Sequence, residues 1–132
     1  MTSDELLSEA DRLLTTVVPG SRGRWPRCCA WLIRLALEQS LDEYWARVLP
    51  DAAECSMRAQ LLLLPRYADA HTAEDATEAW LGLARVTHHH AYDLAPTAAE
   101  LRRWHELVRS ITAELRASDG QPASPESELA GA

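Results

Sequence analysis

Apolar residues recur at intervals of three and four positions along most of this 132-residue chain, and prolines separate the segments in which they do so. This spacing places apolar side chains on one face of an α-helix. The sequence shows no strict alternation of the kind a half-buried strand needs, no glycine-rich phosphate loop and no internal repeat. The pattern predicts an all-α fold, an up-and-down helical bundle of four to five helices with short connections.

Five segments carry the helical pattern, and most of them begin at a recognisable capping residue. Prolines fall between the segments, where helices end. The segments expected to form helices are 2–17 with a capping box at Thr2 and Glu5, 26–49, 57–64 capped by Ser56, 72–87 opened by Thr72 and Asp75, and 97–117 with a capping box at Thr97 and Glu100.

Large apolar residues within these segments are expected to form the core. The run Leu61–Leu64 is apolar all round its helix, which indicates burial on most sides. Tryptophans inside a helical pattern usually pack in the core, and the sequence predicts that role for Trp31, Trp45, Trp80 and Trp104.

The length and a hydrophobic content of 47% fit one compact domain, which we expect over residues 1–117. Residues 118–132 are rich in Ser, Pro, Gly, Glu and Ala with one leucine, and this composition predicts a disordered acidic tail. No stretch approaches the roughly 20 apolar residues that cross a bilayer, and the acidic start of the chain differs from a secretory signal. We therefore expect no membrane contact and a cytoplasmic location.

Charge and cysteine content narrow the classes of function. A net charge of −7 gives no general attraction to nucleic acid, so an RNA site requires a local positive patch. All 13 basic residues are arginine, which we attribute to a GC-rich genome. Cys28, Cys29 and Cys55 form neither a disulfide framework nor a zinc-ligand pattern, and they are expected to be small buried hydrophobes.

The densest concentration of reactive side chains follows Arg85, where three consecutive histidines close the segment 72–87. Histidine both takes and gives protons near neutral pH, and an adjacent arginine indicates an anion as the ligand. The chemistry expected here is acid–base catalysis on a phosphate. The candidate residues are Arg85 and His90 as the catalytic pair, His88, His89, Tyr92 and Asp93 in support, and Arg102 and Arg103 as RNA or phosphate contacts.

Arg85 and His90 stand five positions apart, as R-x-x-x-x-H, and they follow a long helix and a leucine-rich helix. Over residues 26–116 this arrangement resembles the HEPN superfamily of small helical bundles, which carry an arginine and a histidine four to six positions apart. The resemblance implies a homodimer whose two motifs line a shared cleft and cleave RNA without a metal ion or other cofactor. In that role His90 moves the proton of a 2′-hydroxyl or leaving oxygen while Arg85 holds the phosphate.

Helix geometry also favours a contribution from a second copy. Five residues of a straight helix turn through about 500°, which leaves the two side chains about 140° apart. Arg85 and His90 therefore meet only if the helix kinks or frays near Thr87, or if a second motif is supplied across a two-fold axis.

Several alternatives stay open from the sequence. One is a HEPN-like bundle without catalysis, which acts as an interaction or regulatory module for a protein partner. Another is a metal-binding hydrolase that combines one of the three histidines with His71 or His105. A purely structural role is a third, with His88 and His89 capping helix carbonyls, His90 packed or solvated, and Arg85 paired with Asp93 or a backbone carbonyl. Trp25, beside the basic loop 22–27, is a candidate for base stacking or an oligomer interface.

Overall fold

The computed structural model describes residues 1–16, 25–88 and 94–118, and the prediction of an all-α bundle is confirmed there. These ranges contain helices and turns and no strand. The elements are α1 (Ser3–Thr16), α2 (Trp25–Val48), α3 (Pro50–Ala53), α4 (Met57–Leu63), a 3-10 turn η1 (Leu64–Arg66), α5 (Ala70–Thr87) and α6 (Ala98–Ala117).

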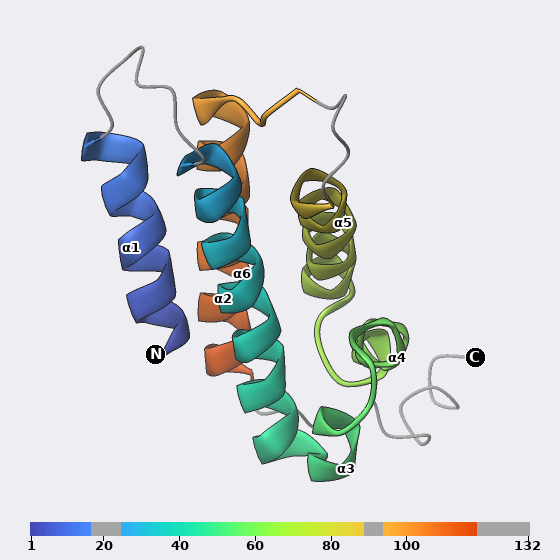
Figure 1. Ribbon diagram of the computed structural model, residues 1–132. Helices are drawn as coiled ribbons and strands as arrows, with labels where there is room; N and C mark the ends of the chain where they lie inside the picture. Colours follow the sequence, from blue (N-terminus) through green and yellow to red (C-terminus); the bar gives the residue numbers. More distant parts are fainter. Residues whose placement is uncertain (17–24, 89–93, 119–132) are drawn as a thin grey trace.

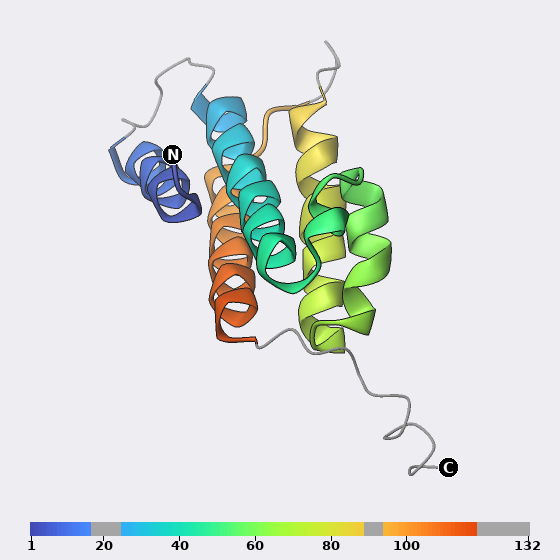
Figure 2. The ribbon, with the colours of Figure 1, turned by 90° about the horizontal axis from the view of Figure 1, so that it is seen from below.

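The four long helices alternate in direction (Figure 1). Helices α1 and α5 run one way, and α2 and α6 run the other. Helix α2 is central, because it contacts α1, α3, α5 and α6. The shorter α4 lies beside α5 (Figure 2). The bundle therefore has α2 and α6 in its middle, α1 on one side, and the α4–α5 pair on the other.

Large apolar residues of α2 and α6 form much of the core, as the helical pattern predicted. Each fully buried leucine or isoleucine side chain contributes about 1.5–3 kcal/mol relative to an exposed one. Helix α5 faces them mainly with alanines, which lets its backbone approach α2 and α6 closely. The buried residues are Cys29, Ile33, Leu37, Leu41, Tyr44 and Trp45 of α2, Ala73, Ala76, Ala79 and Leu83 of α5, and Leu101, Trp104, Val108, Ile111 and Leu115 of α6.

Capping residues begin the helices where the sequence predicted them in three of four cases. The Thr2 amide donates to Glu5 Oε2 at 2.8 Å, and the Glu5 amide donates to Thr2 Oγ1 at 3.2 Å. Ser56 Oγ accepts from the Ala59 amide at 3.2 Å, and Thr97 Oγ1 accepts from the Glu100 amide at 3.1 Å. These bonds satisfy amides that the first turn leaves unpaired.

The expected start of α5 at Thr72 is wrong. The Asp69 carboxylate accepts from the His71 and Thr72 amides at 3.1 and 3.2 Å, so Asp69 caps the helix and Thr72 is buried inside the first turn. A one-turn helix, α3, was also not predicted. Pro50, expected only to end α2, lies in the first turn of α3. The amides of a first turn have no partner within the helix, so a proline there costs no hydrogen bond.

Three expectations of burial are corrected. Leu62 is 74% exposed, because it points about 100° away from the buried Leu61 on α4. Trp31 is 44% exposed on the outer side of α2. Cys28 and Cys55 are exposed as well; only Cys29 among the cysteines is buried.

The remaining predictions concern the C-terminal tail and contact with a membrane. Helix α6 ends at Ala117, and residues 119–132 of the predicted tail lie outside the described residues. Within the described ranges, none of the helices combines the length and the apolar character that crossing a membrane requires.

Candidate functional site

The last turn of α5 carries Arg85, and Thr87 in the same turn is hydrogen-bonded to α2. Thr87 is buried, and its hydroxyl donates to the Leu83 carbonyl at 2.7 Å. The same hydroxyl oxygen accepts a hydrogen bond from Arg34 Nη1 of α2 at 2.9 Å. The His88 amide still bonds the Ala84 carbonyl at 3.0 Å, and the backbone then turns to an extended conformation at His88. The end of α5 thus has a fixed position relative to α2.

Arg85 and His88 both expose their side chains from this fixed turn. Within the described residues, no hydrogen bond or ion pair engages the Arg85 guanidinium. An exposed guanidinium with unused donors can bind a carboxylate or phosphate through two parallel hydrogen bonds. The other predicted members of the site, His89, His90, Tyr92 and Asp93, lie outside the described residues, so their meeting with Arg85 stays a prediction.

Arg34 is the centre of a cluster on α2 and α5 that the sequence did not reveal. Its Nε donates to Glu38 Oε1 at 3.0 Å, and its guanidinium carbon lies 4.9 Å from the Trp31 ring centroid and 5.8 Å from that of Trp80. Trp80 Nε1 donates to the same Glu38 oxygen at 3.4 Å. Together with its bond to Thr87, Arg34 ties two tryptophans and the end of α5 into one partly buried group.

The polar residues of α6 that the sequence singled out face in different directions. Arg102 Nη2 donates to the Leu14 carbonyl of α1 at 3.4 Å, and His105 Nε2 lies 2.9 Å from the Leu7 carbonyl, also on α1. The Arg103 guanidinium carbon instead lies 5.1 Å from the ring of Trp104, which packs against Gly82 of α5. Of the two predicted phosphate contacts, Arg103 is therefore the one on the α5 side of the bundle.

Two histidines of the metal hypothesis, His71 and His88, are widely separated. His71 begins α5, where it lies 3.4 Å from Asp75, and His88 caps the other end of the helix, about 25 Å away along its axis. Across residues 1–16, 25–88 and 94–118, no three His, Cys, Asp or Glu side chains are placed to share a metal ion.

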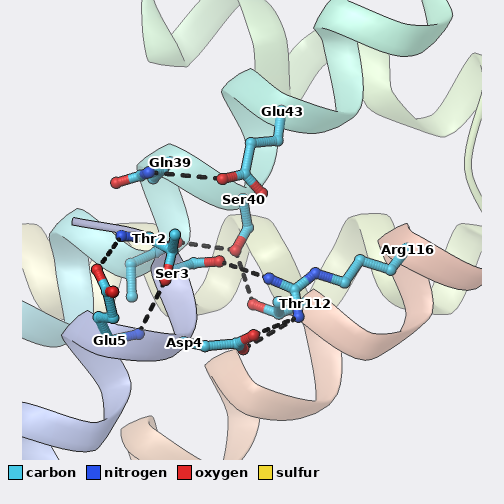
Figure 3. Close-up of polar contacts among 10 residues, drawn as sticks. Thr2, Ser3, Asp4, Glu5, Gln39, Ser40, Glu43, Thr112 and Arg116 are labelled. Carbon is cyan, nitrogen blue, oxygen red and sulfur yellow. Dashed lines mark hydrogen bonds and ion pairs between the residues drawn. The ribbon is translucent and has the colours of Figure 1, made fainter.

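A groove lies elsewhere, between α2 and α6. It has a volume of about 490 Å³, and two of its lining residues, Ser40 and Thr112, are buried and joined by a hydrogen bond of 2.7 Å. Figure 3 shows Ser40 and Thr112 facing each other beside the N-terminus of α1. The lining residues are Ser40, Glu43, Ala46, Arg47, Thr112, Leu115 and Arg116.

The arginines of this α2–α6 groove already have partners within the chain. Arg116 donates from Nη1 to both Asp4 carboxylate oxygens at 2.9 and 3.0 Å and from Nη2 to Ser3 Oγ at 3.0 Å (Figure 3). Arg47 Nη2 donates to the Leu115 carbonyl at 2.9 Å. The Arg116 contacts attach α1 to α6, and the Arg47 contact joins α2 to α6, so we assign them a structural role.

Comparison with known proteins adds no support for the motif. The chain matches no family model, no curated protein and no solved structure. The resemblance to the HEPN superfamily therefore rests on the residues Arg85 and His90 and on the helical pattern around them.

Proposed function

We propose that this protein is a HEPN-like endoribonuclease that cleaves RNA without a metal ion, with Arg85 and His90 as its catalytic residues. The observation that supports the proposal is the state of Arg85. Its exposed guanidinium has no partner among the described residues, yet it projects from a turn that the Arg34–Thr87 hydrogen bond of 2.9 Å holds in place. A positioned but unused cation is suited to an anionic substrate.

The chemistry follows from the two residue types. His90 accepts the proton of a ribose 2′-hydroxyl, whose oxygen then attacks the adjacent phosphorus. The bond to the 5′-oxygen of the next nucleotide breaks, and that oxygen receives a proton. The products are a 2′,3′-cyclic phosphate and a 5′-hydroxyl end, so atoms and charges balance without an added cofactor. Arg85 stabilises the charge that accumulates on the phosphoryl oxygens.

The resemblance implies that a second copy completes the site. Helix α5 ends at Thr87 and the backbone is extended at His88, so the separation of about 140° expected on a straight helix does not apply to Arg85 and His90. A two-fold axis near the end of α5 brings Arg85 of one copy toward His90 of the other, and it creates two equivalent sites in one cleft.

Incubation with RNA tests this function directly. Purified protein in excess chelator should cut mixed RNA to fragments with cyclic-phosphate ends, and Arg85→Ala and His90→Ala should each lower the rate by roughly 100-fold or more. His71→Ala, an exposed histidine at the far end of the same helix, and Arg12→Ala, an exposed arginine of α1, are the matched controls and should leave the rate unchanged. Intact RNA under all conditions would reject the proposal.

A second candidate is a HEPN-like interaction module without catalysis. The observation that favours it is the pair of exposed leucines Leu62 and Leu81, 74% and 55% exposed on α4 and α5. Large apolar side chains next to a groove mark protein contacts in many folded domains. Binding of a partner protein by this chain, together with RNA that stays intact, is the result that would favour this candidate.

A further inference from the structure

Helices α4 and α5 lie side by side, on the side of the bundle away from α1 (Figure 2). Between them is a groove of about 400 Å³ whose lining includes the exposed side chains of Leu62 and Leu81. Exposed leucines of this size, close together, are uncommon on a surface that faces only water. We call this the α4–α5 surface; its groove is lined by Arg58, Leu61, Leu62, Thr77, Trp80 and Leu81.

The exposed charges of α4 and η1 are basic, and those that precede Leu81 on the exposed stripe of α5 are acidic. Arg58 lies one helical turn before Leu62, and Arg66 follows it in η1, whereas Glu74 and Glu78 precede Leu81 on the exposed stripe of α5. All four charged side chains are exposed. In the part of the chain that the structure describes, none of the four takes part in a hydrogen bond or an ion pair.

We propose that the α4–α5 surface binds the same surface of a second copy of this chain. A two-fold rotation places α4 of each copy against α5 of the other, as an isologous interface requires. The basic edge carrying Arg58 then faces the acidic edge carrying Glu78, and the leucines fill the middle. A surface that carries both an apolar centre and two edges of opposite charge is complementary to itself.

The inference rests on the proposed function in one respect: the second copy bound here is also the copy that completes the RNA-cleaving cleft. Arg85 follows Leu81 by four residues, about 6 Å along α5, on the same exposed stripe. An axis near Leu81 therefore places the Arg85 side chains of both copies beside the interface. Self-association itself needs no RNA and no catalysis.

Sedimentation velocity of the full chain, without RNA, tests the interface. The wild type should sediment as a dimer at micromolar concentration. Leu62→Glu and Leu81→Glu should each raise the dissociation constant by roughly thirty-fold or more, since each buries a charge at the centre of the interface. Leu94→Glu is the matched control, because Leu94 is a 95% exposed leucine outside the surface, and its dimer should be unaffected.

Charge reversal shows whether the partner is a second copy in this orientation. Arg58→Glu and Glu78→Arg should each weaken their own homodimer, because like charges then face each other at both edges. An equimolar mixture of the two variants should form a heterodimer, because every edge again carries opposite charges. Circular dichroism should show that each variant is folded.

A monomeric wild type, or a dimer that none of these four variants weakens, would overturn the proposed interface. Failure of the two charge variants to associate when mixed would overturn it as well. A dimer with the expected responses and no RNA cleavage would reject the ribonuclease function and leave the interface standing.

Discussion

At the scale of single residues, Gly82 controls how closely α5 and α6 approach. A methyl group added at Gly82 would lie 2.4 Å from Cη2 and Cζ2 of Trp104, well inside contact distance. Trp104 is buried on α6 and has little room to move. The glycine is therefore needed for packing, although glycine weakens a helix by about 1 kcal/mol relative to alanine.

Gly82→Ala should lower the free energy of unfolding by about 1–3 kcal/mol, because the added methyl group overpacks the contact with Trp104. Urea denaturation measures this change. In a Trp104→Leu background the same substitution should be much less destabilising, since the ring atoms that it meets are gone. A gain in stability in the wild-type background, as helix propensity alone implies, would show that the contact is not limiting.

Cys29 is a second residue whose surroundings decide its chemistry. Its Sγ lies 3.6 Å from the Ala10 carbonyl of α1, and burial, with a smaller effect of Asp11, raises the pKa of the thiol to about 11. A thiol-specific reagent near pH 8 should therefore modify the exposed Cys28 and Cys55 in the native protein. Cys29 should react only after denaturation, and three fast-reacting thiols in the native protein would contradict this.

The raised pKa of Cys29 also predicts how stability depends on pH. Between the ordinary pKa of 9.0 and the folded value of about 11, the unfolded chain has lost the proton that the folded chain keeps. This stabilising contribution is complete below about pH 9 and is lost as the pH rises toward 11. Unfolding free energies at pH 8 and about pH 10.5 should differ more for the wild type than for Cys29→Ala. An equal change in unfolding free energy for the two proteins would contradict this pH dependence.

At the scale of helices, sequence patterns predicted most boundaries because caps and prolines act locally. Thr2, Ser56 and Thr97 each bond an amide three residues ahead, which is a contact that spacing alone defines. Asp69 was missed because Thr72 with Asp75 has similar spacing, and only the folded backbone distinguishes the two. Arg34 was missed because its partners Thr87 and Trp80 are on another helix, far away in the sequence.

Arg34 should be the residue that holds the end of α5. Arg34→Leu keeps the apolar stem but removes the hydrogen bonds to Glu38 and Thr87, so we expect a loss of about 1–3 kcal/mol in unfolding free energy. Hydrogen exchange of the last amides of α5 should become faster. Arg12→Leu removes an exposed pair with Glu9 and should change stability by less than about 0.5 kcal/mol. An equally small effect of Arg34→Leu would show that α5 does not depend on this contact.

At the scale of the whole molecule, helical periodicity predicted the inner faces but not the outer surface. The spacing places Leu62 and Leu81 off the buried stripe of their helices. The residue type alone does not show whether such a leucine packs in the core or binds a partner. The candidate site was found from the arrangement of Arg85 and His90 in the sequence. Its closure into one cleft depends on a second copy, which no local pattern encodes.

In the function that we propose, RNA is cleaved by Arg85 of one copy together with His90 of another. The most direct test mixes the Arg85→Ala and His90→Ala proteins and measures RNA cleavage in chelator. A mixed dimer then has one site with both residues lost and one site with both intact, so the mixture should recover about a quarter of the wild-type rate although each variant alone is inactive. A mixture as inactive as its components, beside an active wild type, would contradict the shared cleft, and an inactive wild type would contradict the function itself.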